Sequence, residues 1–367
     1  MYFAIGCGRK SLGNMNVNLN GKEEVTFDAI VIGSGISGGY AAMELCVKGY
    51  KTLVLERGRM VKHGEYPTAN LDKWDLPNQN MVSAEEKALH YYKQERLGWW
   101  VNEDNKHWIN KDDEYPYNEE ERFDWIRGHH VGGRSIMWGR HCYRWSDIDF
   151  EANLKDGIAI DWPIRYKDIA PWYDYVERFV GVSGQKEGLK QIPDGQFLKP
   201  FPLNCAEQFF REAVGKVYPE RVITPGRVAN LSEYNPEVHK GTRGKCQTRD
   251  RCWRGCPYGG YFSSLSATLA VAADTGNLFE PALYVAGNGV TVGLDLHGHG
   301  FGDLAGAPPH REAVPPVNQD ADEAEADLGN VVVVSLISPL AEQRALARDI
   351  IGADRFVEVF VDAPLQV

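Results

Sequence analysis

The sequence lacks any apolar run that approaches the ~18 residues a helix needs to cross a bilayer, although 43% of its 367 residues are hydrophobic. It also lacks an excess of positive charge: the formal net charge is −11, which argues against a nucleic-acid partner. Neither a signal peptide nor a twin-arginine signal is recognisable. Residues 1–24 are therefore predicted to be an unstructured leader, and a cytoplasmic and a periplasmic location both stay open.

Two residue types are missing from the C-terminal part. No lysine follows Lys245 and no tryptophan follows Trp253. Residues 281–367 carry 4 Arg and no Lys against 13 Asp and Glu. This change of composition predicts a boundary near residue 280. Residues 279–330, with paired prolines and an acidic run, are predicted to be a linker or a degenerate segment.

The N-terminal part contains a strand–turn–helix–strand pattern. Residues 25–32 are rich in strand formers, residues 33–38 are a glycine-rich turn, residues 39–48 are helical in pattern, and residues 51–56 form a second strand that ends in an acid. Because a bare G-x-G-x-x-G is weak evidence, this complete context is the important observation. It predicts a dinucleotide-binding α/β fold.

Each residue of the turn has an expected role. Gly33 allows the tight turn, Gly35 lets the backbone approach a pyrophosphate, and Gly38 lets the helix pack closely on the strand. Ser37 lies in the first helical turn, where unpaired N–H groups attract phosphates. Glu56 is placed to accept hydrogen bonds from ribose hydroxyls.

A second glycine-rich segment at residues 127–140 indicates which kind of dinucleotide is bound. A nicotinamide enzyme has no need of it, whereas extended FAD needs a second backbone segment against its pyrophosphate and isoalloxazine. FAD is therefore the predicted cofactor. The candidate FAD-binding residues are Gly33, Gly35, Ser37, Gly38, Glu56, Arg57, Val131, Gly132, Gly133, Ser135, Trp138 and Gly139.

These two motifs, in this order, resemble the glucose–methanol–choline (GMC) oxidoreductases over residues 25–278, and the resemblance is strongest to sugar dehydrogenases that include glucoside 3-dehydrogenases. It implies a Rossmann-like FAD-binding domain with an incomplete substrate domain, and hydride transfer from a CH–OH group of a sugar or glycoside to the flavin. It also implies a small helper subunit and a cytochrome c or quinone acceptor. Some relatives attach flavin to a His at the position of Met137, so non-covalent FAD is expected here. The family's catalytic base lies outside the matched region, and no catalytic residue is assigned.

Three cysteines, Cys246, Cys252 and Cys256, lie in the basic loop 246–256. A structural zinc site usually has a fourth ligand and C-x2–4-C spacing, which this loop lacks. Three thiolates suit an iron–sulfur cluster, and the same spacing in the resembling dehydrogenases implies a 3Fe-4S cluster. Zinc and unliganded or disulfide-bonded thiols stay as alternatives. Arg249, Arg251 and Arg254 are expected to offset the charge of the thiolates and cluster sulfides and to raise the reduction potential.

Two further segments complete the prediction. The aromatic insert 60–126 is interpreted as either a sugar-binding surface or a lid over the flavin. Residues 335–339 and 358–365 resemble strings in adenylylsulfate kinases, a resemblance that extends over about 280–367, with 331–367 as its clearest part. The sequence contains no G-x-x-x-x-G-K-[ST] phosphate loop, so kinase activity is not expected. The predicted fold class is thus α/β, with a partial P-loop-kinase-like C-terminal segment. Three alternative functions stay open: a non-catalytic remnant that only binds FAD or the cluster, a remnant sulfate-activating function of the C-terminal part, and an oxidase that uses O₂.

Overall fold

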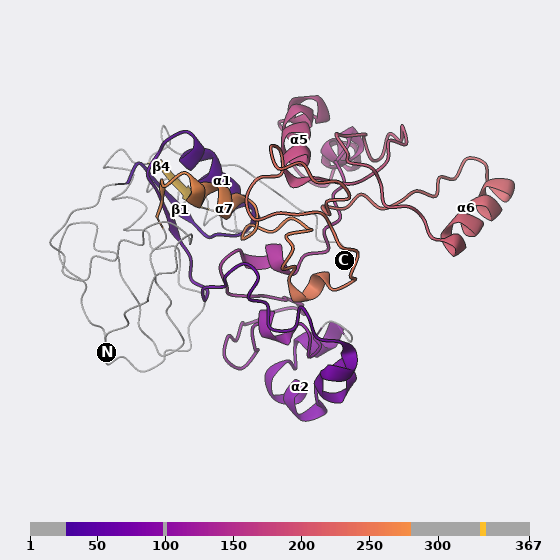
Figure 1. Ribbon diagram of the computed structural model, residues 1–367. Helices are drawn as coiled ribbons and strands as arrows, with labels where there is room; N and C mark the ends of the chain where they lie inside the picture. Colours follow the sequence, from indigo (N-terminus) through magenta and orange to yellow (C-terminus); the bar gives the residue numbers. More distant parts are fainter. Residues whose placement is uncertain (1–26, 98–100, 280–330, 335–367) are drawn as a thin grey trace, which may run out of the picture. The chain divides into compact units, whose positions relative to one another are not determined.

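The computed structural model describes residues 27–97, 101–279 and 331–334 (Figure 1). They divide into two compact units, which are described separately. The first unit contains residues 27–61, 81–97, 101–133, 272–279 and 331–334, and the second contains residues 62–80 and 134–271. Within these ranges, no helix has both the length and the apolar character needed to cross a membrane.

A small parallel sheet forms the core of the first unit. Its strand order is β3-β2-β1-β4, and every neighbouring pair is parallel. The strands are β1 (Ala29–Ile32), β2 (Thr52–Leu55), β3 (Leu278–Phe279) and β4 (Val331–Val334). The side chains of Val31 and Val54 are 0% and 1% exposed, as expected for parallel strands covered on both faces. The prediction of an α/β fold with a parallel sheet is confirmed.

Helix α1 (Ile36–Val47) connects β1 to β2. It begins after Gly35, whose backbone is extended, and the chain turns away at Gly49, whose φ of +91° lies in the left-handed region. Its buried face includes Ala42, Met43 and Cys46. The predicted strand–turn–helix–strand pattern is therefore present.

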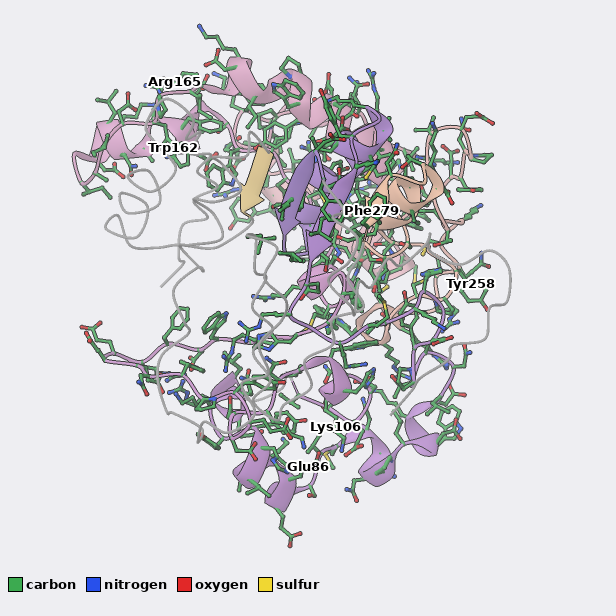
Figure 2. All side chains as sticks on the ribbon, turned by 90° about the vertical axis from the view of Figure 1, so that its left-hand side faces the viewer. Glu86, Lys106, Trp162, Arg165, Tyr258 and Phe279 are labelled. Atoms are coloured by element: carbon green, nitrogen blue, oxygen red, sulfur yellow. The ribbon has the colours of Figure 1, made fainter. Side chains whose placement is uncertain are left out.

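The part of the aromatic insert that belongs to the first unit contains helix α2 (Ala84–His90). The Ser83 side chain accepts a hydrogen bond from the backbone of Glu86 and caps this helix. Lys106 lies 2.8 Å from the Glu86 carboxylate (Figure 2). Trp108 is 1% exposed and is a core residue, so it presents no free face to a sugar.

The second unit is held by buried ion pairs. Helix α5 (Tyr166–Val180) supplies Glu177 to the guanidinium of Arg144. The side chains of Arg227 and Glu187 are each 1% exposed and form a second pair. Removing one partner would leave a buried charge, so the loss of either pair is expected to destabilise this unit.

Apart from the 13-residue helix α6 (Cys205–Val217), the remaining helices of the described residues are short. Those with α-helical geometry are α3 (Asp147–Phe150), α4 (Ala152–Asp156) and α7 (Thr268–Asp274). The 3-10 helices are η1 (Lys73–Asp75), η2 (Pro77–Asn80), η3 (Gln94–Leu97), η4 (Lys106–Trp108), η5 (Gly133–Ile136) and η6 (Cys252–Arg254).

Several predictions fall outside the described residues. The leader 1–24, the linker 279–330 except its first residue, and the kinase-like strings 335–339 and 358–365 belong to this group. Residues Val331–Val334 form a strand that pairs with β1 in register, Ala29 opposite Val331. The division of the C-terminal part into a linker and a kinase-like segment stays a prediction.

Candidate functional site

The glycine turn between β1 and α1 has the geometry that a dinucleotide fingerprint requires. Gly33 has φ of +92°, which a residue with a side chain rarely adopts. A Cβ atom on Gly38 would lie 1.9 Å from the Gly33 carbonyl oxygen, so helix and strand touch at this point. A Cβ atom on Gly35 would meet nothing within 4 Å. The turn thus packs tightly against α1 at Gly38, whereas Gly35, beside the N-terminus of α1, has open space next to it.

Glu56, at the end of β2, is bonded to the same turn. Its carboxylate accepts hydrogen bonds from the Ser34 backbone N–H at 3.0 Å and from the Ser34 hydroxyl at 2.5 Å. Its other oxygen accepts from the Gly58 N–H at 2.8 Å. Arg57 is exposed, and its guanidinium lies 3.4 Å from Nδ1 of His129. Because a carboxylate has about four acceptor sites, Glu56 retains capacity for a ribose hydroxyl.

The structure brings the second glycine segment against the first. The Gly132 N–H donates to the Ser34 hydroxyl at 2.9 Å. A Cβ atom on Gly133 would lie 3.3 Å from the Cα atom of Gly35. Val131 is buried and its N–H donates to the Arg59 carbonyl. Residues almost 100 positions apart in the chain therefore line one turn.

The end of the second glycine segment is bonded to residues 261–264 within the second unit. Ser135 accepts a hydrogen bond through its hydroxyl from the Ser264 N–H at 3.0 Å. The Trp138 indole N–H donates to the Phe262 carbonyl at 2.9 Å. Met137, the position implied for covalent attachment in some relatives, is 4% exposed. The Ser135 hydroxyl and the Trp138 indole N–H, which were both predicted to lie at the FAD site, are thus hydrogen-bonded to the protein.

Three histidines near the second glycine segment have lowered pKa values. Burial, with the charge of Arg59, lowers the pKa of His130 to about 4. Burial, with the charge of Arg57, lowers the pKa of His129 to about 3. His107, packed against Trp108, has its pKa lowered to about 4 for the same main reason. This part of the site therefore carries no histidine charge at neutral pH.

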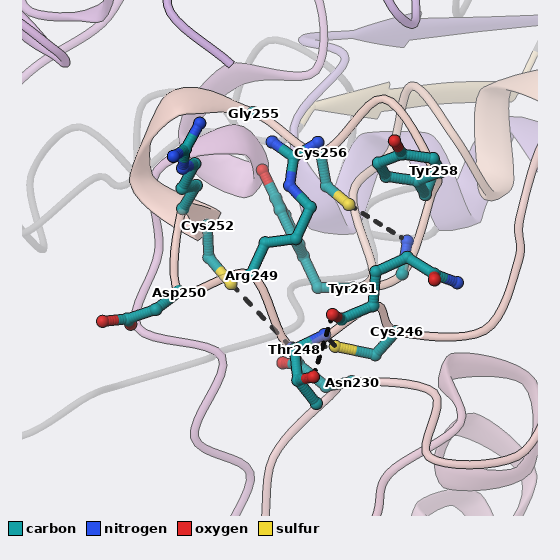
Figure 3. Close-up of a pocket in the computed structure, with 13 residues that line it drawn as sticks. Asn230, Cys246, Thr248, Arg249, Asp250, Cys252, Gly255, Cys256, Tyr258 and Tyr261 are labelled. Carbon is teal, nitrogen blue, oxygen red and sulfur yellow. Dashed lines mark hydrogen bonds between the residues drawn. The ribbon is translucent and has the colours of Figure 1, made fainter. Parts of the chain in front are cut away.

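Cys246, Cys252 and Cys256 line one pocket in the second unit, together with Tyr261 and Asn230 (Figure 3). The bend of the loop depends on Gly255, whose φ is +86°. The six cysteines in the described ranges are free of disulfide bonds. The three cysteines named as ligands therefore share one pocket and are free thiols, and their role as ligands stays a prediction.

Every sulfur of the pocket receives an N–H group. The backbone N–H of Thr248 lies 3.5 Å from Sγ of Cys246, and that of Gly260 lies 3.4 Å from Sγ of Cys256. The side-chain amide of Asn230 donates to Cys246 at 3.6 Å and to Cys252 at 3.9 Å. Asn230 was not identified from the sequence, because nothing in the spacing connects it with the cysteines.

The arginines of the cysteine loop bond to a distant segment of the chain. Arg249 and Arg251 hydrogen-bond to groups of the segment 69–72, and Arg254 donates to the Leu71 carbonyl. These bonds hold the loop in place. Burial raises the pKa of Cys252, and the positive charge of Arg140 partly opposes this rise. Arg140, whose guanidinium lies over the rings of Trp253 and Tyr261, is the cation that acts on the thiol.

Comparison with known proteins gives two kinds of match. The 2-methyl-1,2-propanediol dehydrogenase of Mycolicibacterium austroafricanum is 28% identical over 159 residues, which are 43% of this chain and 25% of that protein. The fructose dehydrogenase large subunit of Gluconobacter japonicus is 23% identical over 254 residues, which are 67% of this chain and 43% of that protein. The chain thus resembles GMC-type oxidoreductases. It spans less than half the length of these relatives.

The second match covers the C-terminus. The family model described as adenylylsulphate kinase matches residues 314–367. The matched segment is shorter than the predicted 280–367, and it includes part of the predicted linker. Among solved structures, a formate oxidase of Aspergillus oryzae studied for FAD modification is 14% identical, with a TM-score of 0.30. The aligned region covers 70% of this chain and 38% of the formate oxidase chain.

Proposed function

We propose that this chain is a module of an FAD-dependent dehydrogenase that oxidises a CH–OH group of a sugar or glycoside and passes the electrons through an iron–sulfur cluster. Support comes from the contact between the two glycine segments at Gly33–Gly38 and Gly132–Gly133. That contact is the observation on which the proposal depends, because a nicotinamide site does not need the second segment. The resemblance to GMC-type enzymes agrees with it.

The residues around the turn fit the diphosphate end of FAD. The first N–H groups of α1 have no partners within the helix, and no side chain caps them. The helix dipole adds a partial positive charge there. Gly35 leaves open space where a pyrophosphate would approach, and Glu56 would accept from a ribose hydroxyl. Flavin, when bound, supplies a two-electron hydride acceptor.

The cysteine pocket supplies three thiolate ligands, from Cys246, Cys252 and Cys256. In the part of the chain that the structure describes, no three His, Cys, Asp or Glu side chains form a group that could hold a metal ion, so the choice of metal rests on the number of ligands. A structural zinc site would need a fourth ligand, whereas three thiolates suit a 3Fe-4S cluster. The N–H groups directed at the sulfurs would also stabilise the negative charge of thiolates that ligate a cluster.

Substrate and partners follow from the relatives. The name of the fructose dehydrogenase large subunit states both a sugar and the existence of other subunits. By analogy, this chain takes a sugar or glycoside and associates with a small helper subunit, and its electrons leave to a cytochrome c or a quinone. Non-covalent FAD is expected, because Met137 offers no nucleophilic nitrogen. No residue is assigned as the catalytic base.

The test is the cofactor content of the purified chain. Absorption and EPR spectra, with flavin and iron quantified per chain, are expected to show released FAD and iron in the ratio of a three-iron cluster. Cys256→Ser is expected to lose the iron but keep the flavin. Cys205→Ser, at an exposed cysteine of the same unit, is the matched control and should keep both. A wild-type chain that stays colourless after incubation with excess FAD and iron–sulfide would refute the proposal.

Two alternatives have distinct outcomes in the same preparations. A chain that binds both cofactors but reduces no dye with any sugar would be a non-catalytic remnant. The adenylylsulphate kinase match at 314–367 suggests a sulfate-activating function instead. Measurable ATP affinity would support that function, and the absence of a phosphate loop from the sequence predicts none.

A further inference from the structure

Asn230 occupies a fixed position at the wall of the cysteine pocket. Its neighbours Ala229 and Leu231 are both 0% exposed. The Leu231 N–H donates to the Gly260 carbonyl at 2.8 Å, and the Phe262 N–H donates to the Ala229 carbonyl at 2.9 Å. The backbone on both sides of Asn230 is therefore bonded to the segment that follows the last cysteine. This arrangement directs the side-chain amide toward the sulfurs (Figure 3).

The amide group can serve two sulfurs at once. A side-chain NH₂ has two hydrogens, and a thiolate sulfur has none to give. The amide nitrogen of Asn230 lies 3.6 Å from Sγ of Cys246 and 3.9 Å from Sγ of Cys252, so one hydrogen is available to each sulfur. Cys246 and Cys256 also receive backbone N–H groups, from Thr248 and Gly260. The bond to Cys252 comes from a side chain, so a single substitution removes it.

We propose that Asn230 is a positioning residue that sets the reduction potential of the iron–sulfur cluster, by donating one hydrogen bond to each of two cluster thiolates. This inference rests on the proposed function, because it requires the cluster at Cys246, Cys252 and Cys256. Reduction adds one negative charge to the cluster and its sulfur ligands. Hydrogen bonds to those sulfurs stabilise the reduced form more than the oxidised form, and so they raise the potential.

The test compares two nearly isosteric variants in an EPR-monitored redox titration at pH 8. Asn230→Leu removes both hydrogens, and Asn230→Asp replaces the donor with a negative charge. At a fixed applied potential, Asn230→Leu is expected to lower the ratio of reduced to oxidised cluster at least tenfold. For a one-electron couple, a tenfold change corresponds to a decrease of about 59 mV in the reduction potential. Asn230→Asp is expected to lower it further.

The matched control is Asn153→Leu. The Asn153 amide donates to the Ile160 carbonyl in the same unit and touches no sulfur, so this variant should keep the wild-type potential. An Asn230→Leu protein with a full iron content and an unchanged potential would overturn the inference. A wild-type chain without iron would instead overturn the proposed function, so the two failures are distinguishable.

A second measurement uses the wild-type chain and does not depend on the folding of a variant. Protein labelled with ¹⁵N only at asparagine is expected to show a ¹⁵N coupling to the cluster in pulsed EPR. The absence of that coupling in an iron-loaded sample would mean that no asparagine amide contacts the sulfurs. That result would overturn the inference even if Asn230→Leu failed to assemble a cluster.

Discussion

Gly38→Ala is the sharpest test of how the glycine turn is built. The added Cβ atom would lie 1.9 Å from the Gly33 carbonyl oxygen and 2.9 Å from its carbonyl carbon, whereas ordinary non-bonded atoms stay about 3.5–4.0 Å apart. Neither atom belongs to a flexible side chain, and the Gly33 N–H is bonded to the Leu55 carbonyl at 2.8 Å. Helix α1 must therefore move away from β1 by more than 1 Å.

The expected cost is at or above the upper end for an overpacked core, about 3 kcal/mol of unfolding free energy. For a domain of this size that corresponds to a decrease of about 6–12 °C in Tm. Since the displaced helix also moves its N-terminal N–H groups, the FAD content per chain should fall as well. Thermal unfolding followed by circular dichroism measures the first effect, and the flavin absorbance of the purified chain measures the second.

Two other glycines serve as matched controls. Gly35→Ala introduces a methyl group into open space at an ordinary φ of −64°, so Tm without FAD should be unchanged while FAD content falls. Gly215→Ala, inside α6 with nothing within 4 Å, should raise the stability by about 0.5–1 kcal/mol and leave FAD content unchanged. A Gly38→Ala protein with the Tm and flavin content of the wild type would refute the close-approach argument.

Three further outcomes are expected. Arg227→Ala leaves the carboxylate of Glu187 buried without its partner and should cost about 3–5 kcal/mol in urea unfolding, whereas Arg122→Ala, in an exposed pair, should cost less than about 1 kcal/mol. Glu56→Gln converts an acceptor of three hydrogen bonds into a neutral amide, so FAD titration should show weaker binding; unchanged affinity would remove Glu56 from the site. Because burial lowers the pKa of His130 to about 4 while an unfolded histidine titrates near 6.5, its contribution to stability is complete above about pH 6.5 and is lost as pH falls toward 4. His130→Gln should flatten this pH dependence of the unfolding free energy, and a wild-type stability that is constant from pH 7.5 to 4.5 would contradict it.

The parts of the fold that were predictable have a local cause. The alternation of strand formers, glycines and a helical pattern between residues 25 and 56 depends on short-range preferences, and α1 overlaps the predicted helix 39–48 but begins three residues earlier. The helix at Tyr166–Val180 was predictable from its amphipathic pattern. The clustering of three cysteines in eleven positions also brings them together through one short loop.

The parts that were not predictable depend on long-range contacts. Asn230 reaches sulfurs that follow it by 16 and 22 positions, and its neighbours give no signal of this. Arg249 and Arg251 were expected to act on thiolates because of their proximity in sequence, yet their guanidinium groups bind a segment about 180 positions earlier.

The start of helix α6, by contrast, has a local signal in the sequence, because Asn204 and Glu207 form a capping box.

The pairing of Val331–Val334 with β1 affects how shortened versions of the chain will behave. If a version ended at residue 279, the hydrogen-bonding groups along one side of Ala29–Ile32 would lose their partner strand. Four apolar residues with a bare backbone edge are a template for adding another chain. Such a version should self-associate even with both glycine segments and the cysteine loop intact, so the valine strand protects the protein against aggregation.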